Sequence, residues 1–255
     1  MRFRLQSYTV GISLTALTLA LIAGQASAQS GTQTVLGTTA VFGSPAGNSG
    51  LPGGATAPTA FLLTPGTSRL LTFSSVTGSA SLNGTQFYGP DGGIYTGVAN
   101  TNIGAFGGLT GIFDSFKFFT GALFAVFTAG PPVGSTSAQT DITSTQSNTA
   151  FNPSLNQVFF VGDGLVGNGS GATQQFFVPN GATTLFLGIV DSNTVAGSGG
   201  NATVPGAYGD NAGSFVANFQ VSATAPEPTT LALAAVAILS TGVKCFRRRS
   251  RGAGI

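Results

Sequence analysis

The most constraining feature of the sequence is the alternation of apolar and polar residues from Ser214 to Ser222. Phe, Ala, Phe and Val occupy every second position, and polar side chains occupy most positions between them. A period of two places the apolar side chains on one face of an extended strand. The run therefore predicts a β-strand that lies on an apolar core. The chain between residues 29 and 225 shows no sustained helical period.

Further short apolar runs, separated by Gly, Pro, Asn and Ser turn signals, predict more strands. They are Arg69–Val76, Gly111–Phe119, Ala122–Thr128, Gln157–Val161, Gln174–Val178 and Thr183–Val190. About eight short strands without helices predict an all-β fold, an antiparallel β-sandwich, for residues 59–223. Residues 29–58 are rich in Gly, Ser, Thr and Ala, and this composition predicts a flexible lead-in, in which Thr34–Phe42 is a candidate for a single strand.

The segment before the alternating strand, Val204–Phe215, is a glycine-rich turn with adjacent Asp210 and Asn211. Asp and Asn side chains and loop carbonyls offer the hard oxygen ligands that calcium prefers. The same residues are also common in ordinary turns. Composition alone leaves both interpretations open.

The N-terminus is typical of a secretory signal peptide. A basic start at Met1–Arg4 precedes the uncharged apolar run Val10–Ala23, and Ala26 and Ala28 form a small-x-small cleavage site. We expect cleavage after Ala28, so residues 1–28 are the predicted signal peptide.

The C-terminus carries a second targeting pattern. Pro226, Glu227 and Pro228 precede the uncharged run Thr229–Val243, and a basic cluster follows it. Fifteen helical residues span about 22 Å, which is short for a hydrocarbon core of about 30 Å, but flanking basic side chains can snorkel. The positive cluster is expected to stay cytoplasmic. We therefore predict a short transmembrane helix that holds the domain outside the inner membrane.

These three parts, within residues 224–251, resemble the PEP-CTERM sorting signal, with Arg247, Arg248 and Arg249 in its basic tail. The resemblance implies export in a Gram-negative bacterium and processing by an exosortase-type enzyme near Pro-Glu-Pro. It implies inner-membrane anchoring before processing, and the cell surface or the extracellular space afterwards. Many members of this family are linked to exopolysaccharide and the cell envelope.

Without both signals, residues 29–225 contain two basic residues and six aspartates, a net charge of −4. No basic patch remains for nucleic acid. The chain has no histidine, and its one cysteine, Cys245, lies in the tail, which argues against His-dependent catalysis and a zinc site. A glycosidase needs two placed carboxylates, and the sequence shows no candidate pair. We therefore expect no enzymatic activity.

Val204–Phe215 is also similar to the calcium loop of small bacterial galactose-binding lectins of the LecA type. Gly78–Gly92 is similar to the earlier site loop of those lectins, and Gly121–Leu123 matches their central strand. The resemblance covers about 60 residues in the same order. It implies a galactose-binding, jelly-roll-like β-sandwich for the body of the chain.

The resemblance implies a calcium site with side-chain oxygens from Asp210 and Asn211 and backbone oxygens from Ala207 and Leu82. The lectins carry one more acid where this chain has a threonine. Asp191 is the nearest acid, and it completes the implied set if the segment after it is a looped-out insertion. Two carboxylates would then face the 2+ ion.

In these lectins the ion binds sugar hydroxyls, and a histidine assists. This chain has no histidine, so Tyr88 and Tyr208 are the candidate sugar contacts. The first functional hypothesis is a calcium-binding, lectin-like surface module that binds envelope or exopolysaccharide carbohydrate. The second is a purely structural surface or biofilm-matrix protein without sugar binding.

Overall fold

The computed structural model describes residues 28–43, 50–94, 98–114, 121–130, 139–167, 169–192, 200–202 and 204–223. Every regular element in these ranges is a β-strand or a single turn of 3-10 helix. The prediction of an all-β fold is therefore confirmed for this part of the chain.

The strands form three sheets. The first has the order β1-β13-β3-β10-β8: Gln29–Leu36, Ala212–Ala223, Arg69–Ser81, Gln175–Val178 and Ala150–Phe151. The second, which we call the middle sheet, has the order β2-β11-β6-β9: Ala60–Leu62, Thr184–Ile189, Leu123–Thr128 and Val158–Phe160. The third has the order β12-β4-β5-β7: Gly200–Ala202, Val98–Ile103, Ile112–Asp114 and Thr140–Asp141. The 3-10 turns are η1 (Val41–Gly43), η2 (Thr145–Ser147) and η3 (Tyr208–Asp210).

Strands β6, β9 and β11 of the middle sheet are buried on both faces, whereas its edge strand β2 is largely exposed. All residues of the paired strands β6 and β11 are buried, and their side chains alternate between two separate cores. The predicted apolar face of β11, Leu185, Leu187 and Ile189, lies in the first core, while Phe186 points into the second. Such strands are apolar at nearly every position, so their sequence carries no alternation.

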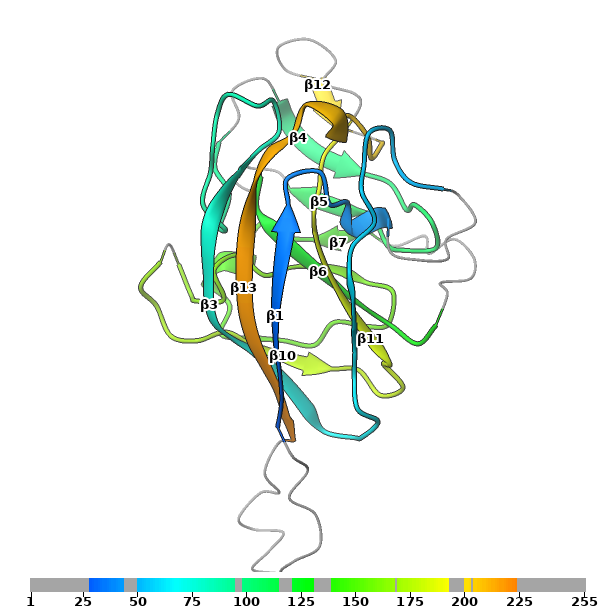
Figure 1. Cartoon of the computed structure of the whole chain (residues 1–255), viewed down its shortest axis with the longest axis vertical. Coiled ribbons are helices and arrows are strands. Elements are labelled where there is room, and N and C mark those ends of the chain that lie inside the picture. Colours follow the sequence, from blue (N-terminus) through cyan, green and yellow to red (C-terminus); the bar gives the residue numbers. More distant parts are fainter. Residues whose placement is uncertain are drawn as a thin grey trace, which may run out of the picture.

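The first core fills the space between the middle sheet and the long curved strands β1, β13 and β3, which lie side by side in Figure 1. Phenylalanine rings dominate this core and meet in edge-to-face, stacked and tilted pairs, of which two are edge to face. The Phe73 and Phe176 ring centroids are 5.8 Å apart, and those of Phe61 and Phe219 are 4.8 Å apart. Edge-to-face contacts of this kind add stability beyond the burial of apolar area.

The second core covers the opposite face of the middle sheet. It contains Val41 and Phe42 of η1 together with Ile103 and Ile112 of the third sheet. The described structure therefore has a third layer beyond the two that a simple sandwich prediction supplies. It is also not purely antiparallel, because the pairs β10–β8, β12–β4 and β5–β7 are parallel.

The prediction of a flexible lead-in over residues 29–58 is wrong for most of its length. β1 pairs with β13 along all of Gln29–Leu36, and the side chains of Val41 and Phe42 are buried. The polar composition of this segment reflects an edge strand with an exposed outer face, which composition alone does not distinguish from a loop. Residues 29–43 thus belong to the β-domain.

The close approach of η1 to β11 gives a first prediction. A Cβ atom on Gly188 would lie 2.4 Å from the Val41 backbone nitrogen, so Gly188→Ala forces the two segments apart. Overpacking of this kind costs about 1–3 kcal/mol. We expect chemical denaturation to show that loss for Gly188→Ala. Gly89→Ala, where a Cβ meets nothing within 4 Å, serves as the control and should stay within about 0.5 kcal/mol of wild type. Equal stability of the two variants would contradict this packing.

Candidate metal centre

The predicted calcium loop runs into the N-terminal end of β13 beside the chain that leaves β11. The Gly206 N–H donates to the Asp191 carbonyl oxygen at 3.1 Å, and Pro205 forms an isolated bridge with Ser192. The loop is thereby attached to the segment that carries Asp191. Asp191 therefore lies beside the predicted calcium loop, although it precedes Asp210 by nineteen positions.

The loop backbone is strained and closely packed. Ala207 has a φ of 63°, in the left-handed region that costs a residue with a Cβ about 1 kcal/mol. The Tyr208 N–H donates to the Gly53 carbonyl oxygen at 3.0 Å. A Cβ on Gly54 would lie 2.3 Å from the Gly209 nitrogen, so these backbones touch. Neighbouring segments therefore hold Ala207 in its unusual conformation.

Tyr208 is the anchor of the loop. Its side chain is fully buried, its phenol donates to the Ile189 carbonyl oxygen at 3.1 Å, and it accepts from the Asp191 N–H at 3.0 Å. Burial raises the pKa of this phenol, so it stays a neutral donor. The expectation that Tyr208 contacts a sugar is wrong, because its ring is enclosed in the protein interior.

Asp191 follows β11 by two residues, and only 8 % of its surface is exposed. Its Oδ1 accepts a hydrogen bond from the Ser192 N–H at 2.7 Å. Its Oδ2 is buried and accepts no hydrogen bond of normal geometry in the described structure, although the Asn211 side chain lies near enough to the carboxyl to lower its pKa. Burial is the main reason why the pKa of Asp191 rises to about 7. The charge of Asp210 raises it further, while the Ser192 N–H and the nearby Asn211 side chain oppose the shift.

The side chain of Asn211 carries a second buried oxygen without a hydrogen-bond partner. Asn211 is also 8 % exposed, and its Nδ2 donates to the Gly37 carbonyl oxygen at 2.9 Å. This bond fixes the amide so that Oδ1 is the remaining group, and Oδ1 is buried without a donor among the described residues. Buried polar atoms are nearly always hydrogen-bonded, so two such oxygens on neighbouring side chains call for an explanation.

The other implied ligands lie around this pair. Asp210 is exposed, and its charge acts on the Asp191 carboxyl. Ser81 pairs with Ala212, a register that brings Leu82, the next residue, toward Asn211. The loop after Leu82 also passes close by, since a Cβ on Gly84 would lie 3.2 Å from the Asp210 carbonyl oxygen. Residues of the implied set thus come from three segments that meet at this end of β13.

The candidate ligands fit a hard cation, and only two of them, Asp191 and Asp210, are charged. Their donor atoms are all oxygens, which suits calcium. Within the described ranges, no group of three or more His, Cys, Asp or Glu side chains is placed to hold a metal. An ion here would therefore depend on two carboxylates and on neutral amide and carbonyl oxygens.

Tyr88, the second candidate sugar contact, is half-buried. Its phenol O–H lies within hydrogen-bond distance of two acceptors, Gln86 Oε1 at 3.2 Å and the Ile94 carbonyl oxygen at 3.1 Å. A Cβ on Gly93 would lie 2.1 Å from the ring, so the Gly93 backbone rests directly against it. A sugar contact by Tyr88 stays a prediction, with part of its ring already covered.

A pair of carboxylates that the sequence did not reveal lies elsewhere. The Asp163 N–H donates to Asp91 Oδ1 at 2.9 Å, and the Leu165 N–H donates to Asp163 Oδ1 at 2.8 Å. Burial raises the pKa of Asp91 to about 6, and the Asp163 charge adds to the rise, against the Asp163 N–H bond. The two residues are 72 positions apart in separate glycine-rich turns, so spacing gave no signal.

Several predicted features lie outside the described residues. They are the signal peptide up to residue 27, with Ala26, and the sorting signal, with Pro226, Glu227, Pro228, Arg247, Arg248 and Arg249. Ala28, the last residue before the expected cleavage point, is exposed and directly precedes β1. The described part of the chain includes no helix of sufficient length and apolarity to cross a membrane.

Comparison with protein-family models, with curated proteins and with solved structures finds no match for this chain. The resemblances to the PEP-CTERM sorting signal and to the galactose-binding lectins accordingly stay predictions.

The Asp91–Asp163 pair predicts a pH-dependent stability. Since the folded-state pKa of Asp91, about 6, exceeds its ordinary value of 3.8, its contribution to stability is present below pH 3.8 and lost as the pH rises through 6. Asp91→Asn keeps the acceptor for the Asp163 N–H without the charge. We expect this variant to gain about 1 kcal/mol on wild type between pH 4 and pH 8, a value reduced for partial exposure.

Denaturant unfolding at both pH values measures this gain. Asp141→Asn is the matched control: Asp141 is exposed, and the Thr143 N–H lowers its pKa, so its contribution has the opposite sign. A pH profile of Asp91→Asn that parallels wild type would show that the pair does not titrate in this range.

Proposed function

We propose that this chain is an exported cell-surface or matrix protein whose β-domain binds one calcium ion at the N-terminal end of β13. The observation that carries the proposal is the pair of buried oxygens, Asp191 Oδ2 and Asn211 Oδ1, that lack donors in the described structure. A buried oxygen without a partner costs about 1–3 kcal/mol, and more when it is charged. A cation between the two would remove both costs.

The neighbouring residues supply the rest of the chemistry. Asp191 and Asp210 would together balance the 2+ charge, and Asn211 Oδ1 would add a neutral ligand. The backbone oxygens of Ala207 and Leu82, with water, would complete the six to eight oxygens that calcium takes. The left-handed conformation of Ala207 supports this assignment, because strained backbone is concentrated at ligand-binding sites.

Bound calcium would join segments that the chain otherwise connects only through long paths. It would bridge the end of β11, the loop before β13 and the end of β3. Because the ion would bind the folded state and not the unfolded chain, it would stabilise the fold by mass action. An affinity of about 10⁻⁴–10⁻³ M, typical of extracellular modules, would suffice outside the cell.

The proposed location rests on the two terminal signals. An exosortase-type enzyme would process the C-terminus after export, and the domain would then act at the cell surface or outside the cell. There it would contribute a calcium-stabilised β-domain to the envelope or to an exopolysaccharide matrix. No catalytic role is proposed.

A second candidate function is that of a purely structural matrix protein, in which the bound calcium would stabilise the fold and would not contact a sugar. The burial of Tyr208 favours this alternative, because it removes one of the two aromatic side chains expected beside an ion-bound sugar. The cation site is common to both functions.

Calcium titration tests the site. At a calcium concentration a hundred times the Kd, the stability gain is about 2.7 kcal/mol, which for a domain of this size raises the melting temperature by about 5–10 °C. We expect this shift for wild type and its loss for Asp191→Asn. Without calcium, Asp191→Asn should melt at or above wild type, because the substitution removes a buried charge that has no counter-ion.

Asp141→Asn is again the control, since it makes the same substitution at an exposed position. It should keep the full calcium shift. Calorimetry that detects no binding heat, together with a melting temperature that calcium leaves unchanged, would remove the site. A full shift in Asp191→Asn would place the ion elsewhere in the molecule.

A further inference from the structure

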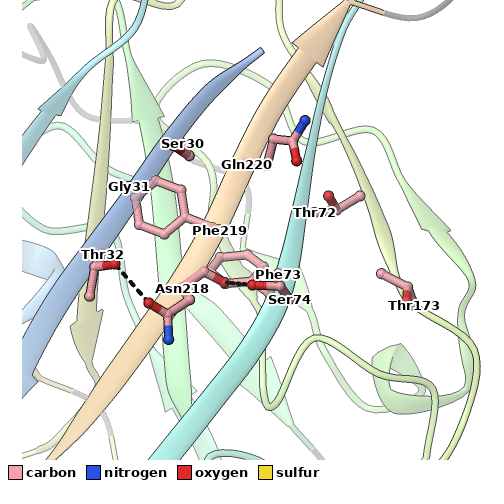
Figure 2. Close-up of a pocket in the computed structure, with 10 residues that line it drawn as sticks. All are labelled: Ser30, Gly31, Thr32, Thr72, Phe73, Ser74, Thr173, Asn218, Phe219 and Gln220. Carbon is pink, nitrogen blue, oxygen red and sulfur yellow. Dashed lines mark hydrogen bonds between the residues drawn. The ribbon is translucent and has the colours of Figure 1, made fainter.

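The outward face of the five-stranded sheet carries an open groove of about 560 Å³ (Figure 2). Its floor is formed by β1, β13 and β3, and Thr173, from the segment before β10, stands at one side. Recognition sites for small molecules have volumes of about 300–1,000 Å³. The groove is therefore large enough to hold a ligand of several rings or a stretch of a longer chain.

Strand register brings polar side chains together in this groove. Thr32 pairs with Asn218, and Ser30 pairs with Gln220, which in turn pairs with Thr72. Alternation turns Phe219 and its neighbours inward and leaves the hydroxyls and amides outside. The register shift between Asn218 and Phe219 is a bulge, and a bulge increases the local twist of a sheet.

Some polar side chains of the groove are hydrogen-bonded to other side chains, and others are not. Thr32 Oγ1 donates to Asn218 Oδ1 at 2.7 Å, and Asn218 Nδ2 donates to Ser75 Oγ at 3.0 Å, so one amide links three strands. Figure 2 shows the first of these bonds crossing from β1 to β13. The side chains of Gln220, Thr72 and Thr173 make no hydrogen bond with other described residues. Their donors and acceptors face the solvent and are available to a ligand that enters the groove.

The charge and the polarity of the lining side chains indicate which class of ligand the groove can bind. None of the lining side chains is charged, so phosphates, nucleic acids and acidic or basic peptides find no opposite charge. The rings of Phe73 and Phe219 are only 2 % exposed, so a lipid chain finds little apolar surface. A ligand that presents many neutral hydroxyl groups matches both the hydroxyls and the amides.

We propose that this groove binds a neutral polysaccharide chain without the help of the cation. The site is separate from the candidate metal centre, because Asn211 precedes β13 and Gln220 lies nine residues further along it. That separation corresponds to about 30 Å of extended strand. The inference goes beyond the proposed function, since it concerns another face of the molecule and needs no ion.

An array of neutral and acidic oligosaccharides, probed with the intact protein with calcium and with excess EDTA, tests the inference. We expect binding to neutral oligosaccharides that EDTA does not weaken. Gln220→Ala should reduce the affinity about tenfold, because it removes the free amide from the groove. Gln175→Ala is the matched control: it removes an exposed glutamine from β10 of the same sheet, outside the groove, and should bind as wild type does.

Thr173→Ala provides a second variant that leaves the strand pairing intact, and it should also weaken binding. Melting temperatures close to wild type would show that both groove variants fold. The inference is overturned if no neutral oligosaccharide binds, or if only acidic ones do. It is also overturned if EDTA abolishes binding while Gln220→Ala has no effect, a result that would place the sugar at the cation loop. The calcium melting shift reports separately on that loop.

Discussion

The pairing of β6 with β11 is the interaction on which the rest of the structure depends. Both strands are buried at every position, so other parts of the protein must cover both faces of this pair. The five-stranded sheet covers one face, and η1 with the third sheet covers the other. This requirement explains why a polar N-terminal segment is an integral part of the domain, because without η1 the apolar side chain of Phe186 would lose its cover.

The candidate metal centre depends on this rigid middle sheet. Asp191 lies two residues beyond β11, at a point where the chain is still held by the Tyr208 phenol. Asn211 is fixed in turn by the Gly37 carbonyl oxygen. The two unsatisfied oxygens are therefore a built property of the site, and this is the physical basis on which a cation is proposed.

The sequence predicted those parts of the fold whose pattern is local. The Ser214–Ser222 alternation corresponds to most of β13, and the apolar face of β11 was also recovered. The all-oxygen character of Asp191, Asp210 and Asn211 was likewise readable, since it depends on side-chain chemistry. The start and the extent of β1 were not predicted, because an exposed edge strand has the composition of a loop.

The parts that could not be predicted depend on tertiary packing. The Asp91–Asp163 pair forms between two turns that only the assembled sheets bring together. The burial of Tyr208 was also hidden, because a tyrosine in a glycine-rich turn is as suited to an exposed surface as to a core. Similarly, the polar groove is formed by three strands far apart in sequence.

The position of the last strand has a mechanical consequence. β13 lies between β1 and β3 and is antiparallel to both, and its C-terminal end lies beside the start of β1 (Figure 1). A pull on that end is directed along the strand, across interstrand hydrogen bonds that run perpendicular to it. The hydrogen bonds of both ladders are then loaded together in shear. In a terminal hairpin that is pulled apart at its ends, the bonds would instead break one at a time. A domain held at its C-terminus would thus resist drag through the strand that also carries the groove.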